Sequence, residues 1–174
     1  MEFISIQEAI NKSTGIVHLR GWCYRERKSN KLGFIVLRDH SNIIQCVVDK
    51  AVVSSAVWGA SNKVSIETSL WLEGEIVEDE RAPTGYEERV KNLEIIHCAE
   101  RYPITKDQST EFLLDERHLW IRSRELTNVW KVKSVVLAAC RDFFATKNYY
   151  ETTTPIITGS SCEGGCYLFE IKYF

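Results

Sequence analysis

The chain has 174 residues, 44% of them hydrophobic and 26% charged, and a formal net charge of −2 at pH 7. This composition is typical of a folded globular protein and excludes a disordered chain. No apolar run approaches the roughly 20 residues that a membrane-spanning helix needs, which excludes a transmembrane protein. The length allows one large domain, or one small domain and part of a second, so the domain count has to come from the sequence pattern.

The amino terminus and the cysteines both favour a reduced, cytoplasmic protein. The first residues lack the basic start and the apolar run of a secretory signal. Most of the six cysteines are scattered among apolar neighbours, unlike the framework of a small disulfide-rich domain. Cys162 and Cys166 offer two metal ligands, but a structural zinc site needs about four, so we expect no metal.

The charges are unevenly distributed along the chain. Between residues 20 and 40 there are six basic residues and only two acidic ones. The basic residues are Arg20, Arg25, Arg27, Lys28, Lys31 and Arg38. Residues 73–80, by contrast, form an acidic block. A basic patch on a nearly neutral chain predicts one defined binding face rather than general binding to polyanions.

Five runs of β-forming residues lie in the first part of the chain. They cover residues 16–23, 33–38, 43–48, 70–77 and 90–97. Turn-forming residues at 39–42 predict a hairpin between the second and third runs, and residues 50–58 predict a short helix. Three strands, a helix and two strands match the five-stranded OB barrel, which commonly binds oligonucleotides. We therefore expect an OB domain in residues 1–103.

The pattern changes after Pro103, which predicts an α+β chain with a second domain. Residues 104–125 are expected to form a linker that includes a short helical stretch at 119–124. Apolar residues at helical spacing predict a long helix over residues 126–147. Residues 151–157 and 167–174 have the composition of strands, so residues 126–174 are interpreted as the truncated start of a larger domain.

Three segments of the expected barrel, residues 20–27, 33–39 and 44–48, have a recognisable order and spacing. They resemble the anticodon-binding signature of the class II aminoacyl-tRNA synthetases of the aspartate, asparagine and lysine subgroup. Phe34 and Gln45 fall where that family stacks on and hydrogen-bonds the central anticodon uridine. By the same resemblance, Arg25 and Arg27 are expected to contact the anticodon loop.

The second part of the chain carries the same resemblance. Residues 112–124 resemble the family's linker, and residues 147–155 resemble motif 1, the helix and strand of the dimer interface, to which Pro155 belongs. Residues 160–165 resemble the mobile loop over the amino-acid substrate, in which Glu163 would pair with the substrate ammonium and Gly164 would allow movement. Residues 81–87 and 161–169 are closer to asparaginyl than to aspartyl enzymes.

The resemblance implies a complete, homodimeric enzyme that uses ATP and Mg²⁺ to attach asparagine to tRNA. Nothing in the chain resembles motif 2 or motif 3, which hold ATP in the family, so the chain alone is expected to bind the anticodon without catalysis. We assign no catalytic residue. The alternatives are an aspartyl-tRNA synthetase fragment and a freestanding OB-fold RNA-binding module.

Each candidate residue also has a purely structural interpretation. Alternation alone favours Phe34 as a residue of the barrel core, and Gln45 is then merely a polar position. Arg25, Arg27 and Lys28 fit a solvated charged turn equally well. Glu163 fits a hinge with an exposed carboxylate.

Overall fold

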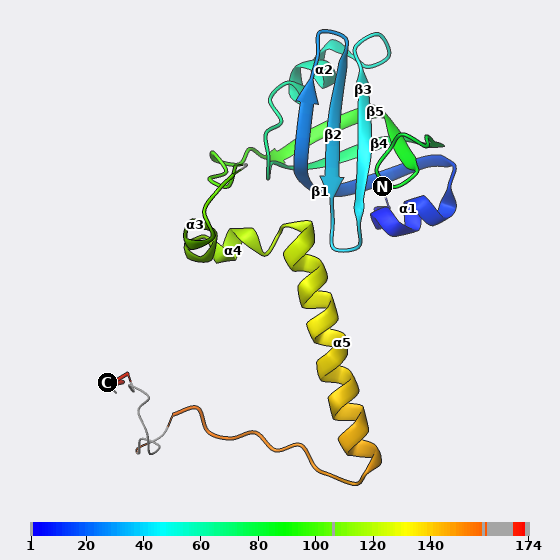
Figure 1. The fold of residues 1–174 in the computed structure, drawn as a ribbon. Coiled ribbons are helices and arrows are strands. Elements are labelled where there is room, and N and C mark those ends of the chain that lie inside the picture. Colours follow the sequence, from blue (N-terminus) through cyan, green and yellow to red (C-terminus); the bar gives the residue numbers. More distant parts are fainter. Residues whose placement is uncertain (1, 106, 158, 160–168, 173–174) are drawn as a thin grey trace. The chain divides into compact units, whose positions relative to one another are not determined.

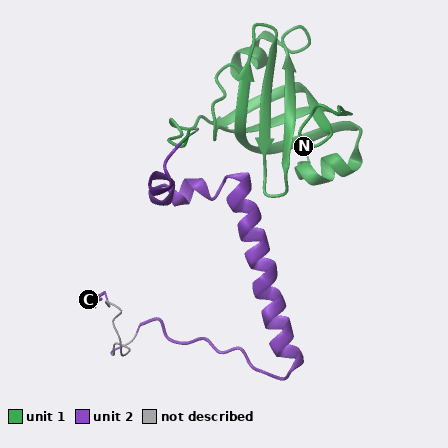
Figure 2. Cartoon of the chain, in the orientation of Figure 1, with its two compact units in different colours: residues 1–107 green, residues 108–174 purple. Residues whose placement is uncertain are grey.

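The computed structural model of the chain describes residues 2–105, 107–157, 159 and 169–172 (Figure 1). Contacts between residues divide the chain into two compact units, Met1–Asp107 and Gln108–Phe174 (Figure 2). The two units differ in kind. The first is built around a β-barrel, whereas every regular element of the described part of the second is a helix. The finer limits at residues 103 and 125 stay predictions.

The first unit is a closed five-stranded barrel, as predicted (Figure 1). Its strands are β1 (Gly15–Lys28), β2 (Leu32–Arg38), β3 (Ile43–Asp49), β4 (Ser69–Glu78) and β5 (Tyr86–His97). Around the barrel they follow the order β1-β2-β3-β5-β4, and β4 pairs with β1 to close it. The β3–β5 pair is parallel and the other four are antiparallel.

Strand β1 is longer than the sequence predicts because it pairs with two neighbours in turn. Its first part, from Gly15 to Trp22, pairs with β4, and its second part, from Trp22 to Lys28, pairs with β2. The register to β2 shifts by one residue between Cys23 and Arg25. Such a β-bulge bends a strand, which lets the single strand β1 pair with β4 at one end and with β2 at the other.

Alternating residues of the strands fill the barrel with aliphatic side chains. In β2, Ile35 and Leu37 are buried, and in β3, Ile44, Cys46 and Val48 are buried. Leu19, Leu70, Leu72 and Ile76 from β1 and β4 complete the centre of this core. The predicted hairpin is confirmed, since β2 and β3 pair along their whole length, from Arg38 and Ile43 beside the turn to Leu32 and Asp49 at the other end.

Two short helices add to the barrel core. Helix α1 (Ile6–Lys12) was missed by the sequence analysis, although Ser5 and Glu8 form a capping box at its start. Its Ile6 and Ala9 are fully buried in the core. Helix α2 (Ser55–Ser61) lies slightly later than the predicted helix at 50–58, because the Ser54 side chain caps it.

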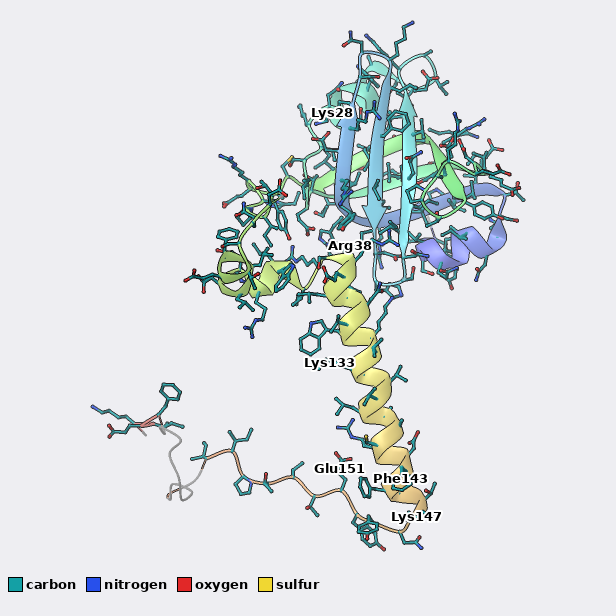
Figure 3. The ribbon with its side chains drawn as sticks, in the orientation of Figure 1. Lys28, Arg38, Lys133, Phe143, Lys147 and Glu151 are labelled. Atoms are coloured by element: carbon teal, nitrogen blue, oxygen red, sulfur yellow. The ribbon has the colours of Figure 1, made fainter. Side chains whose placement is uncertain are left out.

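The second unit contains helices α3 (Thr110–Asp115), α4 (Arg117–Trp120) and α5 (Arg124–Thr146). The long helix is thus confirmed, and the expected linker contains two short helices. Many apolar side chains of α5 are exposed (Figure 3), and those of Val132, Val135 and Phe143 are more than half exposed. Among the described residues, no helix is both long and apolar enough to cross a membrane.

The predicted strand at residues 151–157 is wrong, because these residues have no regular structure. A strand needs an edge to pair with, and the described part of the second unit contains no strand. Pro155 lies in this segment and is exposed. Of the second predicted strand, residues 169–172 are not in a strand either, and the others lie outside the described residues.

One carboxyl group is buried in the barrel core. Glu88 of β5 is fully buried, and the Cys46 thiol donates a hydrogen bond to its Oε2 (3.3 Å). Its Oε1 has no hydrogen-bond partner. Burial disfavours the charged form and raises the pKa of Glu88 from 4.5 to about 8, so the group is protonated at neutral pH.

This burial predicts that Glu88 makes the barrel less stable as the pH rises. Between about pH 4.5 and 8 the unfolded chain releases the Glu88 proton and the folded chain keeps it. The contribution of Glu88 to the free energy of unfolding should therefore fall by about 1.4 kcal/mol per pH unit in this window and level off above it. Glu88→Gln removes this contribution, so the variant should gain stability over the wild type as the pH rises from 5 to 8.

Urea denaturation at pH 5, 6.5 and 8 measures the difference between the wild type and the variant. Glu94→Gln is the matched control, because Glu94 lies on the same strand and is exposed. A constant difference between Glu88→Gln and the wild type across these pH values would contradict the prediction.

Candidate nucleic-acid interface

An open hollow of about 290 Å³ lies over strands β1, β2 and β3. Its lining consists of Arg25, Glu26, Arg27, Phe34, Val36 and Gln45. All four residues that the sequence analysis assigned to the anticodon loop therefore line one hollow, although they come from three strands. Its acidic lining residue, Glu26, lies 3.7 Å from the ammonium group of Lys28.

Strand register places these residues in two adjacent rows across the sheet. The first row runs Arg25, Val36, Gln45, Glu87. The second row runs Arg27, Phe34, Val47, Arg89. Side chains at paired positions of neighbouring strands point to the same face, so each row is a continuous line of side chains from β1 to β5.

Phe34 faces away from the barrel core. Its neighbours Gly33 and Ile35 are buried, whereas Phe34 itself is half-buried, as expected for the outer face of an alternating strand. The interpretation of Phe34 as a core residue is therefore wrong. Its ring instead forms part of the lining of the hollow.

The Gln45 amide is held by a residue that the sequence analysis missed. Gln45 Nε2 donates a hydrogen bond to Glu87 Oε2 (3.3 Å), and Arg89 Nε lies 3.6 Å from Glu87 Oε1. Glu87 is only 7% exposed although it is on the outer face, because its neighbours cover it. Because Nε2 donates to Glu87, the amide is oriented and Gln45 Oε1 is its group that can accept a hydrogen bond from a ligand.

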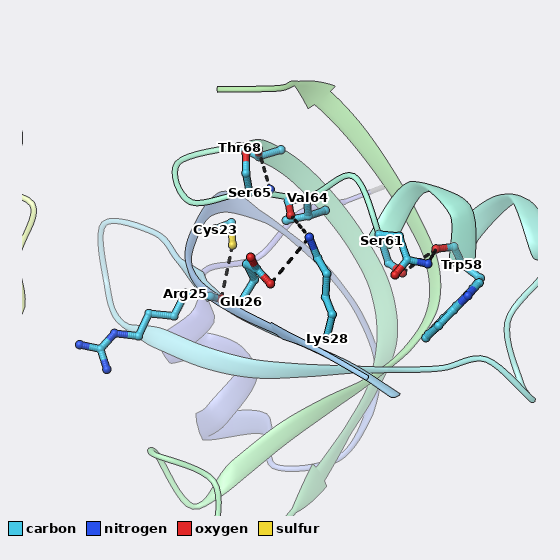
Figure 4. A network of polar contacts seen from close by, with 10 residues as sticks. Cys23, Arg25, Glu26, Lys28, Trp58, Ser61, Val64, Ser65 and Thr68 are labelled. Carbon is cyan, nitrogen blue, oxygen red and sulfur yellow. Dashed lines mark hydrogen bonds and ion pairs between the residues drawn. The ribbon is translucent and has the colours of Figure 1, made fainter. Parts of the chain in front are cut away.

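The side chains of two of the six basic residues donate hydrogen bonds within the first unit. Lys28 Nζ donates to the Val64 carbonyl (2.7 Å), in the network of Figure 4. Arg38 makes two hydrogen bonds to the Glu67 carboxylate, at 2.9 and 3.0 Å, and the two side chains are only 17% and 7% exposed. The basic patch is therefore smaller than its sequence suggests, since these two cations are already engaged.

Arg25 and Arg27 are exposed and lie at the β1 ends of the two rows. Figure 4 shows the Arg25 guanidinium pointing away from the network that engages Lys28. The Arg25 guanidinium also lies over the ring of Tyr24, 5.4 Å from its centre. Both arginines are thus open to solvent and to a ligand on the outer face.

The residues assigned to amino-acid binding, Glu163 and Gly164, lie outside the described residues, as do Cys162 and Cys166. In the described part of the chain, no three His, Cys, Asp or Glu side chains gather where they could hold a metal ion. Among the described residues, the hollow is therefore the candidate interface.

Comparison with known families matches the two parts of the chain to two different families. Residues 17–96 match the family described as OB-fold nucleic acid binding domain, and residues 109–174 match tRNA synthetases class II (D, K and N). The asparagine–tRNA ligase of Thermoplasma acidophilum is 42% identical over 158 residues, which are 91% of this chain and 37% of the relative. That of Pelotomaculum thermopropionicum is 38% identical and is matched over 40% of its length.

The chain is similar to the asparaginyl-tRNA synthetases of class II over nearly its whole length. The asparaginyl-tRNA synthetase of Pyrococcus horikoshii in complex with asparaginyl-adenylate superposes on the whole chain with a TM-score of 0.85, at 35% identity and over 41% of its own length. An aspartyl-tRNA synthetase from Entamoeba histolytica shares the fold at 18% identity, with a TM-score of 0.74. The chain spans about two fifths of the length of its curated relatives and corresponds to their amino-terminal portion.

The ion pair of Arg38 predicts a purely structural role for this arginine. Arg38→Ala leaves the nearly buried Glu67 carboxylate without its guanidinium, which should lower the free energy of unfolding by about 2–4 kcal/mol. The matched control is Arg81→Ala, because Arg81 also makes two bonds to one carboxylate, that of Asp79, but is 90% exposed. It should cost less than about 1 kcal/mol. Equal losses for the two variants in urea denaturation would refute the structural role.

Proposed function

We propose that the first unit binds the anticodon loop of a tRNA and that the complete enzyme attaches asparagine to that tRNA. The observation that carries this proposal is the convergence of Arg25, Arg27, Phe34 and Gln45 on one open hollow. A base can be read from a single-stranded loop only when it is unstacked and held on the protein surface. The hollow offers the groups that this requires.

Phe34 supplies the stacking surface. Its ring lies on the outer face of β2 and lines the hollow, where an unstacked base can cover it. Stacking on an aromatic side chain contributes about 1–3 kcal/mol per base and is largely independent of the base. Phe34 therefore accounts for affinity and not for the choice of base.

Gln45 supplies the choice of base. The central anticodon uridine presents an N–H flanked by two carbonyl oxygens. Gln45 Oε1 would accept from this N–H, and the second hydrogen of Nε2 would be donated to a neighbouring oxygen, because Glu87 takes the first one. Cytosine has no N–H at this position, so it would leave Gln45 Oε1 without a donor. Arg25 and Arg27 would neutralise loop phosphates at the edge of the hollow.

The remaining parts of the proposal concern the complete enzyme. It would be a cytoplasmic homodimer that uses ATP and Mg²⁺, with motif 1 and Pro155 at the subunit interface. Glu163 would hold the ammonium group of asparagine, and Gly164 would let the substrate loop move. The match of residues 109–174 to the synthetase family disfavours a freestanding RNA-binding module, and the sequence relatives favour asparagine over aspartate.

The proposal predicts that Phe34→Ala weakens binding of an RNA stem–loop with an asparagine anticodon by about 1–3 kcal/mol. Loss of the ring removes the surface that replaces base stacking. Trp22→Ala is the control, because Trp22 is an exposed aromatic residue of β1 that lines a different hollow. Fluorescence anisotropy with labelled RNA measures both. Equal weakening by the two variants would count against the hollow as the site.

The proposal also predicts that the 174-residue chain does not exchange pyrophosphate into ATP in the presence of asparagine. Its sequence contains no segment that resembles the ATP-holding motifs 2 and 3 of the family. A complete asparaginyl-tRNA synthetase assayed in parallel is the positive control. Asparagine-dependent exchange by the purified chain would show that it carries a catalytic site of its own.

A further inference from the structure

Arg89 of β5 stands at the end of the second row, beyond the residues that line the hollow. We infer that Arg89 is a further RNA-contacting residue that binds a backbone phosphate next to the base stacked on Phe34. This inference rests on the proposed function of the hollow. It extends the interface from β3 to β5.

The register places Arg89 on the same face as Phe34. Phe34 pairs with Val47 of β3, and Val47 pairs in turn with Arg89. The flanking residues Glu88 and Val90 of β5 are buried in the barrel, so Arg89 points outward. Neighbouring strands lie about 4.8 Å apart, which puts Arg89 roughly 10 Å from Phe34 along the row.

The Arg89 guanidinium can take a phosphate through its terminal amino groups while its Nε stays in an ion pair with Glu87. Its side chain is 68% exposed, and its Nε lies 3.6 Å from Glu87 Oε1, beyond hydrogen-bond distance. Its terminal amino groups make no hydrogen bond to the described part of the chain. Arg38, by contrast, bonds Glu67 through both terminal nitrogens and is largely buried.

The charges around Arg89 permit a phosphate there. Glu87 is covered by its neighbours and already accepts from Gln45, so it is not presented to a ligand. The carboxylate opposite Arg89 on β4, that of Glu75, lies 3.7 Å from the Lys91 ammonium group, which offsets its charge.

The second row then has a cation at each end and an aromatic ring between them. Arg27 lies on one side of Phe34, and Arg89 lies on the other, beyond Val47. A nucleotide stacked on Phe34 has a phosphate on each side of its sugar. Two arginines on opposite sides of the ring suit both phosphates, whereas Arg25 and Arg27 alone would hold only the β1 side.

Lys91 provides a matched control for Arg89. It lies two residues further along β5 and points to the same side, with 47% of its side chain exposed. Its ion pair with Glu75, at 3.7 Å, is similar in length to that of Arg89 with Glu87. The pairing of β5 with β3 ends at Arg89, so Lys91 is not in register with the hollow.

The experiment measures binding of an RNA stem–loop with an asparagine anticodon by the full 174-residue chain at several salt concentrations. Arg89→Ala should weaken binding about threefold to tenfold at low salt and reduce the slope of log K against log salt by about 0.7, the value for one phosphate contact on a single strand. Arg89→Lys should keep the slope, and Lys91→Ala should behave like the wild type. The weakening should be similar for loops with uridine and with cytosine at the central position, since a phosphate carries no sequence information.

Three results would overturn the inference. The first is an unchanged slope for Arg89→Ala. The second is a loss confined to the uridine loop, which would mean that Arg89 acts only through Glu87 and Gln45. The third is an equal effect of Lys91→Ala, which would reflect the general field of β5. If Phe34→Ala weakens binding and Arg89→Ala does not, only this inference fails; if the wild type does not bind the stem–loop, the proposed function fails with it.

Discussion

The arrangement of the binding face depends on the bulge in β1, at which this strand changes its partner from β4 to β2. Cys23 is buried opposite Leu37, and after the one-residue shift Arg25 lies opposite the outward-facing Val36. Without the extra residue, strict alternation would turn Arg25 and Arg27 towards the barrel. The bulge that closes the barrel therefore also brings two arginines to the outer face beside Phe34.

The structure holds this bulge from the loop before β4. The Cys23 carbonyl accepts from Glu67 N (2.7 Å), and Cys23 N donates to the Thr68 carbonyl (2.9 Å). Arg38 fixes the same loop through its two bonds to Glu67. The arginines on the two sides of this bulge therefore have different roles. Arg38 is enclosed with a carboxylate and stabilises the barrel, whereas Arg25 and Arg27 lie on the outer face and remain available to a ligand.

Local pattern was sufficient to predict the strands and the hairpin, but not the contacts between distant strands. Alternation in β2 and β3 is visible in the sequence, and so is the turn between them. Whether Phe34 faces in or out could not be decided by alternation, because that choice needs the register of the whole barrel. Glu87 was missed because its bond to Gln45 joins residues 42 apart through the parallel β3–β5 pair. The bulge was missed because Tyr24 carries no distinctive turn signal.

The wrong strand at residues 151–157 and the correct strands of the barrel have the same physical explanation. β-branched residues favour an extended chain, but an isolated strand leaves its backbone groups without partners, so a strand forms only against another edge. In the barrel every strand has two neighbours, and the buried core residues of the described part of the chain lie between Ile6 and Leu93. The residues that form the two rows, from Arg25 to Arg89, therefore lie on strands that pack around the core of the first unit. The geometry proposed to read the anticodon is in this sense built by the pairing of the barrel strands themselves.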